Sequence, residues 1–226
     1  MNIQKTLLIC ASFLAQTSVF AQASDAVVNR ASKDGNYSRI QVGYNPMMVS
    51  PYYDDADNTC LHGASFSYLY GIKLNPSQPI FLEVGGKIAY HMKKEKEDVN
   101  IEDVTYHMDV TDKVETLSVP VNLTYRIALG NGKVSLSPFA GITFKANLLA
   151  KETVSFKYED ETLNLFDKDD VGKDSQWKRF QVGWQVGINL DTNSGFSIGL
   201  HHGYDFNNIC KKTTTSNWSV TLGYKF

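Results

Sequence analysis

The chain ends in the stretch SNWSVTLGYKF, residues 216–226, in which large apolar residues take every second position. The alternating residues are Trp218, Val220, Leu222, Tyr224 and Phe226. A period of two predicts a β-strand with one apolar face and one small or polar face. Because chain ends usually fray unless they are tied down, a strand this regular must pair with a strand elsewhere in the fold.

Seven earlier segments repeat this alternation. In each of them, large apolar residues alternate with Gly, Ser, Thr, Gln or charged residues. The predicted strands are 37–46, 61–74, 80–92, 114–129, 133–148, 177–190 and 195–206. Together with the last segment they make eight strands, and no stretch past the N-terminus is typical of a long helix.

The connections between these strands are short and long in strict alternation. The short ones are 75–79, 130–132 and 191–194, which are rich in Asn, Gly, Pro and Ser; the long ones are 47–60, 93–113, 149–176 and 207–216. Asn and Gly supply the positive φ angles of tight turns. Outer-membrane barrels have short periplasmic turns and long outer loops, and an even strand count puts both termini on the short-turn side.

The broad apolar face distinguishes a membrane barrel from a soluble one. An eight-stranded lumen is just wide enough for side chains to fill, so the bulky apolar face fits outside better than inside. Aromatic residues near strand ends match an interfacial girdle: Tyr44, Tyr70, Tyr90, Tyr125, Tyr204, Trp218 and Tyr224. His202 is the exception to the apolar outer face, because the alternation puts this polar side chain on the lipid side. The sequence therefore predicts an all-β, eight-stranded antiparallel up-and-down transmembrane β-barrel of the outer-membrane type.

The N-terminus resembles an export signal. Residues 1–23 contain a lysine, then an apolar run, then small residues ending in Ala21-Gln22-Ala23. This three-part pattern predicts a cleaved signal peptide, and the apolar run is too short to span a bilayer as a helix. We therefore expect a signal peptide over 1–23, a short periplasmic segment over 24–36 and the barrel over 37–226, located in the cell outer membrane.

The composition narrows the class of partner. The 226 residues carry a formal net charge of -2 and include 12 Tyr and 12 Phe. Nucleic-acid binding requires a basic patch, which this balance does not favour. Expected partners are instead outer-membrane lipids and lipopolysaccharide on the apolar outer face.

Three internal motifs add a family resemblance. They are LSVPVNLTY at 117–125, PFAG at 138–141 and VGWQVG at 182–187. With the C-terminal strand, they resemble the Bacteroidetes-type outer membrane protein β-barrel family, which is porin-like and eight-stranded. The resemblance implies that the last strand, ending in Phe226, is the signal read by the barrel-assembly machinery.

Charged and histidine side chains on the inner face predict a polar network that plugs the barrel. The inner-face candidates are Glu83, Lys87, His91, Arg126, Lys145, Arg179, His201, Asp205 and Lys225. Buried charges persist only when paired. We expect Glu83 to pair with Arg126 near the short-turn rim. Toward the other rim we expect Asp205 to pair with Arg179, with Lys145 close by.

Several functions remain open at this stage. The first is a structural or surface-interaction role, in which loops 93–113 and 149–176 contact a protein partner. The alternatives are a narrow small-solute porin, an accessory barrel of a secretion apparatus, or a lipid-modifying enzyme. For the enzyme, His201-His202 and Ser219 are the candidate parts, without a supporting motif. We expect no catalytic residue, cofactor or metal site, because the acid-rich loops lack the ligand spacing of a calcium site.

Cys60 and Cys210 are the two cysteines beyond the predicted signal. Both are expected at the long-loop rim, in a compartment where disulfides persist. One interpretation is a disulfide that clamps the first and fourth long loops. The other is two separate thiols, because the first and last strands lie between their anchor points and bridged Cα atoms must lie within about 7 Å.

Overall fold

The computed structural model describes residues 35–51, 58–101, 104–129, 132–158, 161–169, 177–210 and 212–226. The predicted signal peptide and nearly all of the predicted periplasmic segment lie outside these residues and remain predictions. Among the described residues, no helix has the length and apolar character needed to cross a bilayer.

Within the described residues, eleven β-strands form a single antiparallel sheet. They are β1 Tyr37–Tyr44, β2 Met47–Pro51, β3 Thr59–Lys73, β4 Ile80–Ile101, β5 Val104–Tyr125, β6 Ile127–Leu129, β7 Val134–Tyr158, β8 Glu161–Asp169, β9 Phe180–Thr192, β10 Phe196–Asp205 and β11 Thr213–Lys225. Because β2 follows β1 directly and β6 follows β5, they continue the same barrel positions rather than add new ones.

The sheet closes on itself. The ring runs β1-β11-β10-β9-β7-β5-β4-β3, and β1 pairs with both β11 and β3. At the seam, Ser38 and Phe226 exchange backbone hydrogen bonds of 2.7 and 2.9 Å. The prediction of an eight-stranded antiparallel up-and-down ring is confirmed, and the last strand is held by the first.

The first position of the ring is occupied by two consecutive strands, β1 and β2, which a proline separates. Pro46, which lacks an N–H, separates β1 from β2. The pairing with β3 holds on both sides of it, because the Asn45 N–H donates to the Gly63 carbonyl at 2.8 Å and Met47 is the register partner of Leu61.

Alternation along the strands separates an apolar outer face from a polar interior. Val42, Phe66 and Ile88 are 56%, 52% and 57% exposed, while Gln41 and Ser67 are buried. An apolar exterior around a polar interior reverses the arrangement of a soluble barrel, and suits a ring that lies in lipid.

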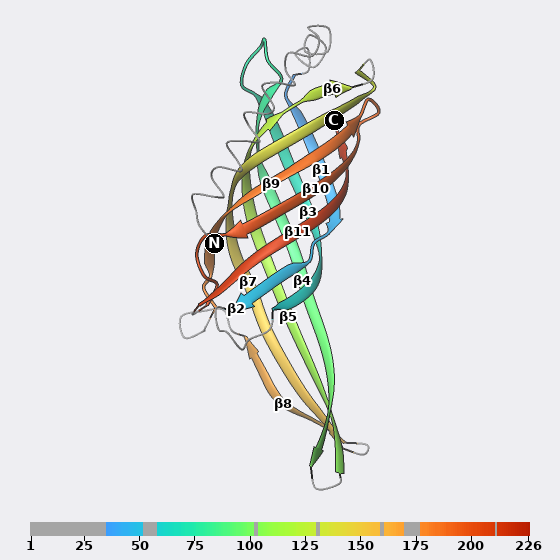
Figure 1. The fold of residues 1–226 in the computed structure, drawn as a ribbon, viewed down its shortest axis with the longest axis vertical. Helices are drawn as coiled ribbons and strands as arrows, with labels where there is room; N and C mark the ends of the chain where they lie inside the picture. The colour runs from blue at the N-terminus through green and yellow to red at the C-terminus, as the bar shows by residue number, and fades with distance from the viewer. Residues whose placement is uncertain are drawn as a thin grey trace.

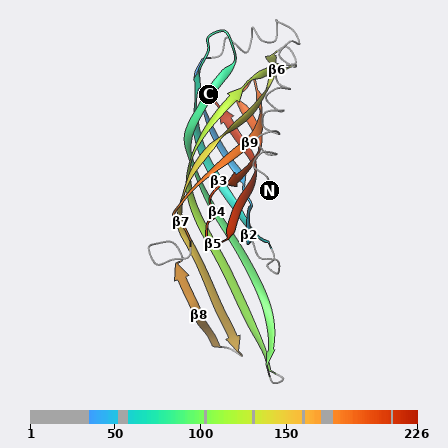
Figure 2. The same cartoon turned by 60° about the vertical axis from the view of Figure 1, so that its left-hand side comes forward.

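The largest departure from the sequence prediction is a sheet that projects beyond the ring (Figure 1). β4 and β5 have 22 residues each and β7 has 25. A tilted membrane strand needs roughly 9–11 residues, so each of these strands is long enough to continue well outside the bilayer. Figure 2 shows the same three strands leaving the ring together, with β8 beside β7. The loops predicted over 93–113 and 149–176 are therefore wrong wherever these strands run.

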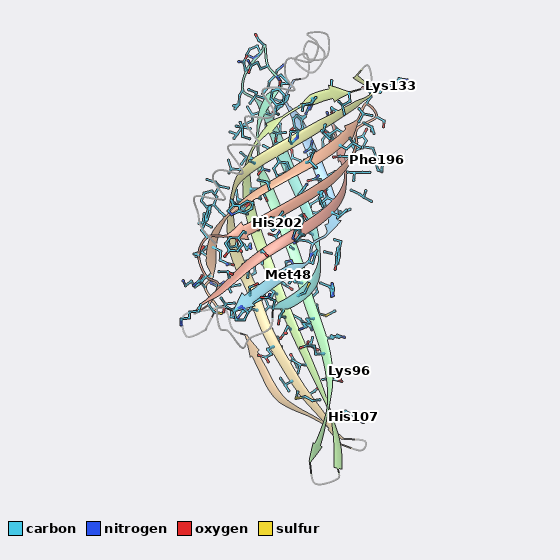
Figure 3. All side chains as sticks on the ribbon, viewed as in Figure 1. Met48, Lys96, His107, Lys133, Phe196 and His202 are labelled. Carbon is cyan, nitrogen blue, oxygen red and sulfur yellow. The ribbon has the colours of Figure 1, made fainter. Side chains whose placement is uncertain are left out.

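Labelled side chains mark the two parts of the molecule in Figure 3. His202 and Met48 lie on the ring, whereas Lys96 and His107 lie far along the projecting sheet; Lys133 and Phe196 lie at the opposite, short-turn end. The projecting sheet and the two short-turn residues thus stand at opposite ends of the long axis.

Cys60 and Cys210 are free thiols in the structure, as in the second of the two interpretations, and the disulfide of the first is not formed. Cys60 lies on β3 opposite Met48 of β2, and β2 also pairs with β11 through the register pair Thr213 and Pro51. The backbones of Cys210 and Thr213 form an isolated antiparallel β-bridge. β2 therefore lies between the two cysteines.

We expect both thiols of the folded protein to react with iodoacetamide in the absence of reductant, because both are partly exposed. Intact mass spectrometry of the exported, unreduced chain should show two added groups. A chain that gains these groups only after reduction would instead contain the disulfide between Cys60 and Cys210.

Candidate functional site

A buried charge network fills the lumen near the short-turn end. The Arg39 guanidinium donates to Glu83 at 2.9 Å and to Asp191 at 2.8 Å, and the side chains of all three are 0% exposed. The Tyr37 hydroxyl also donates to Glu83, and Thr124 donates to its other oxygen at 3.0 Å. Two carboxylates share one guanidinium across three strands, which ties opposite sides of the ring together.

Arg126 joins this network through aromatic rings. Its guanidinium lies 4.5 Å from the ring centroid of Tyr37 and 4.4 Å from that of Phe81. Such cation–π contacts stabilise a cation that is removed from water. The predicted ion pair between Glu83 and Arg126 is therefore wrong, because the ion-pair partner of Glu83 is Arg39. Arg126 instead stacks on Tyr37, the tyrosine that donates a hydrogen bond to Glu83.

The middle of the lumen is held by amide, hydroxyl and ring groups. Gln41 donates to Asn189 at 3.0 Å and to Thr221 at 3.2 Å. The His201 ring lies 3.2 Å from the Asn189 oxygen and edge-on to Phe139, with ring centroids 5.0 Å apart. His201 thus lies inside the ring, as predicted by its position in the alternation.

A second ion pair lies toward the long-loop end. Lys145 donates to Asp205 at 2.5 Å, and Thr215 donates to the same carboxylate. Arg179, the predicted partner of Asp205, is exposed and precedes the first residue of β9. The prediction was wrong because the strand begins one residue after Arg179, and Lys145 takes the place expected for it.

Lys87 and His91 meet at Asn45, just inside the same end. The Lys87 ammonium donates to the Asn45 oxygen at 3.2 Å, and the Asn45 nitrogen lies 3.0 Å from Nε2 of His91. Asn217 also donates to the Asn45 oxygen at 3.2 Å. This amide precedes the Pro46 break, so the break positions a side chain that hydrogen-bonds to groups on both β4 and β11.

An apolar layer lies next to these polar groups, with Val114 opposite His91 in register. Met47, Leu61, Val114 and Ala150 form a buried cluster with exposures of 2–3%. Trp177 packs against it. The strands β2, β3, β5 and β7 each contribute one residue to this apolar layer.

A cavity of about 200 Å³ lies on the outer side of this apolar layer. Leu61, Val114 and Ala150 line it together with Trp177, and Asp112 is among its charged residues. Burial, together with the neighbouring Glu152 carboxylate, raises the pKa of the Asp112 carboxyl. We call this cavity the mouth pocket.

The projecting sheet has two different faces. Val110 and Asp112 on β5 are register partners of Val154 and Glu152 on β7, in the same alternation as the buried Val114. We call this side the lumen-side face. The residues between them, such as Thr111, lie on the opposite face. The lumen-side face thus carries partly exposed apolar groups beyond the ring.

The candidate enzyme residues do not assemble on the lipid side. His201 and Ser219 are register partners inside the ring, where Ser219 is 1% exposed. His202 lies on the outer face and stacks on Trp218 with ring centroids 4.3 Å apart. In the part of the chain that the structure describes, no three His, Cys, Asp or Glu side chains group as metal ligands.

Comparison with protein families agrees with this architecture. A model described as the outer membrane protein beta-barrel domain matches residues 8–226. The chain belongs to this family. Membership places this barrel in the outer membrane, where its apolar outer face contacts lipid. No curated protein matched the sequence.

Solved structures with a similar fold are distant in sequence. Ail, the attachment invasion locus protein of Yersinia pestis, solved with the heparin analogue sucrose octasulfate, is 17% identical with a TM-score of 0.49; the match covers 85% of this chain and 100% of Ail. Neisserial surface protein A is 11% identical with a TM-score of 0.43, covering 85% and 98%. The outer membrane enzyme PagL is 15% identical with a TM-score of 0.39, covering 84% and 98%. These values carry no information about ligands or activity.

The C-terminal strand of this outer-membrane barrel presents its alternating residues outward. Their exposures range from 45% to 64% for Trp218, Val220, Leu222, Tyr224 and Phe226. Lys225 lies on the other side of the strand, with its ammonium 5.6 Å from the ring centroid of Tyr37. The predicted inner position of Lys225 and the lipid-facing aromatic end are both observed.

Sequence reasoning missed three parts of the interior. The alternation puts Arg39 on the polar face of the predicted strand 37–46, but Arg39 is not among the residues of the predicted network, and Asp191 lies in the predicted turn 191–194. Tyr37 precedes the clear alternation. All three residues lie on the inner face of the ring. Their partners come from distant parts of the chain, so the contacts can be predicted only once the closure of the ring is known.

Proposed function

We propose that this outer-membrane barrel is a surface-interaction protein whose projecting sheet binds a protein partner outside the bilayer. The observation that carries the proposal is the continuation of β4, β5 and β7 far beyond the ring, with apolar residues on the lumen-side face. An exposed apolar surface on a structured element is typical of an interaction site.

The filled lumen favours this function over a narrow porin. Charged layers at Arg39 and Lys145, and the apolar layer above them, occupy successive levels of the interior. An accessory role in a secretion apparatus uses the same kind of surface and is a special case of this proposal. The inner location of Ser219 gives the lipid-modifying enzyme no support.

The placement in the envelope belongs to the same proposal. Export through a cleaved signal peptide over 1–23 puts the short turns and both termini in the periplasm and the projecting sheet outside the cell. Lipopolysaccharide then surrounds the ring in the outer leaflet. The C-terminal strand ending in Phe226 is the segment we assign to recognition by the barrel-assembly machinery.

Site-specific photo-crosslinking tests the proposed surface. A photoreactive amino acid at Val110, on the lumen-side face, is expected to give discrete higher-mass adducts after irradiation of intact cells. The same residue at Thr111 is the matched control, because it lies on the opposite face of the same strand. Equal adducts at the two positions, or none at Val110 in a correctly folded barrel, would contradict the proposal.

A further inference from the structure

The apolar outer face of β3 changes character at the long-loop end. From Ala64 to Ile72 every second residue of this strand is apolar and exposed, but the next two outward positions are His62 and Cys60. His62 is exposed, and Cys60 is a partly exposed free thiol. Leu61 between them is buried and lines the mouth pocket. An imidazole and a thiol therefore lie two residues apart on the outer face of one strand.

Each of these side chains has a methionine opposite it on a neighbouring strand. Met48 of β2 is the register partner of Cys60, and Met92 of β4 is the register partner of His62. Directly opposite residues on antiparallel strands share a face, with Cβ atoms about 4.5–5.5 Å apart. Both methionines are partly exposed, whereas Met47 is buried in the apolar layer. We call Met48, Cys60, His62 and Met92 the rim cluster.

Two tyrosine hydroxyl groups contact members of the rim cluster. The Tyr44 hydroxyl lies 2.5 Å from Nδ1 of His62, and the two rings stack with centroids 6.1 Å apart. In the tautomer whose Nδ1–H donates to the tyrosine oxygen, the lone pair of Nε2 is available to a metal ion. Such an outer hydrogen bond is usual for a histidine that binds a metal. The Tyr90 hydroxyl donates to the Met92 sulfur at 3.8 Å.

The donor atoms of the rim cluster select a soft metal ion. Thiolate and thioether sulfurs favour copper(I), and imidazole also suits copper, whereas magnesium, calcium and manganese prefer oxygen ligands. The spacing fits a shared ion. Residues i and i+2 of a strand are roughly 6.6 Å apart, and a metal–sulfur bond is about 2.3 Å long. One ion between Cys60 and His62 can therefore contact both side chains.

The charge of the ligands favours a monovalent ion at this place. One thiolate balances one copper(I) ion, and the imidazole and the thioethers are neutral, so the bound site carries no net charge. Zinc(II) in the same ligands would keep a positive charge. That charge would lie beside the tyrosine rings and near the exposed Lys94, which is two residues from Met92 on the same face of β4. An uncompensated charge is costly in partly apolar surroundings.

We infer that the rim cluster binds one copper(I) ion, with the Cys60 thiolate and Nε2 of His62 as the main ligands and the Met48 and Met92 sulfurs completing the site. The Cys60 thiol releases its proton to water as the copper–sulfur bond forms, and copper keeps its oxidation state. This site goes beyond the proposed binding of a protein partner and does not depend on it, because the partner surface is the lumen-side face and the rim cluster lies on the outer face.

Competition with a coloured copper(I) chelator measures this binding on the folded full chain in detergent. With ascorbate and without oxygen, the barrel is expected to withdraw one equivalent of copper(I) from bicinchoninate. Cys60→Ser and His62→Gln are each expected to weaken binding by at least about 100-fold, because the loss of even an outer partner of a metal ligand costs about 10–100-fold. Met48→Leu with Met92→Leu should weaken it at least about tenfold.

Matched controls remove the same kinds of ligand elsewhere on the chain. They are Cys210→Ser, His202→Gln and Met108→Leu, and each should leave the affinity for copper(I) unchanged. Heat-modified gel mobility shows that each variant is folded before its affinity is compared.

Tyr44→Phe tests the geometry of the site. It removes the hydroxyl next to Nδ1 of His62 and keeps the ring that stacks on the imidazole. Copper(I) binding is expected to weaken about tenfold. Tyr68→Phe is the control, because the Tyr68 hydroxyl lies 2.9 Å from Oγ of Ser38 and not at the rim cluster.

Alkylation of the unmodified protein locates the ion without any variant. Copper(I) should protect Cys60 from iodoacetamide and leave Cys210 reactive, as measured by peptide mass mapping. Equal reactivity of Cys60 with and without copper(I), or equal protection of the two thiols, would overturn the inference. So would equal affinity losses in the ligand and control variants. Tighter binding of zinc(II) than of copper(I) would overturn the assignment to copper.

Discussion

Replacing Arg39 with alanine is expected to lower the free energy of unfolding by about 3–5 kcal/mol. The substitution leaves Glu83 and Asp191, which are 0% exposed, without the guanidinium that they share. Two uncompensated carboxylates then lie in the same part of a narrow interior. Removing one member of a buried ion network is costly, because the remaining charges stay desolvated.

The measurement is urea unfolding in detergent, followed by the mobility difference between unheated and heated protein on a gel. Lys93→Ala is the control, since Lys93 and Glu95 form an ion pair with side chains 23% and 47% exposed. Loss of such a pair costs at most about 1 kcal/mol. Matching midpoints for the two variants would show that the Arg39 network does not stabilise the barrel.

Replacing Phe226 with alanine is expected to reduce the amount of protein in the outer membrane several-fold. If the last strand is the assembly signal, its terminal aromatic is the part that the assembly machinery reads. The effect on the stability of the finished barrel is smaller: the side chain is 64% exposed to lipid, and the backbone bonds between Phe226 and Ser38 remain in the alanine variant.

Two measurements separate assembly from stability. The first is the amount of barrel in isolated outer membranes, and the second is the yield of folding of purified chain into detergent. Phe196→Ala is the control, because Phe196 is a 56% exposed aromatic opposite Tyr224 on the neighbouring strand β10. Equal outer-membrane amounts for the two variants would exclude a special role for the last residue.

The ring was predictable because lipid imposes a simple rule on each strand. Every second residue from Val220 to Phe226 must be apolar, and the same rule identifies the other seven ring positions. Beyond the bilayer the rule ends, since both faces of a strand can meet water. The charged run at 93–98 therefore indicated a loop, although β4 continues through it to Ile101.

The ion pairs were less predictable than the strands. The inner position of Glu83 followed from alternation, but its partner Arg39 sits two ring positions away across the lumen, on β1. Such pairing depends on the closed circumference and on the side-chain directions within it. The prediction for Arg179 was wrong for a local reason. Alternation assigns a face only within a strand, and Arg179 precedes the first residue of β9.

The continuous path of β4, β5 and β7 from ring to projecting sheet has a mechanical consequence. A partner that pulls on the sheet applies force along strands whose register pairs extend from His107 and Lys157 down to Thr124 and Phe139. Strands pulled lengthwise must slide past their neighbours, so many hydrogen bonds bear the load together instead of opening one after another. Force is thus carried into the wall of the barrel, and the bilayer itself becomes the anchor.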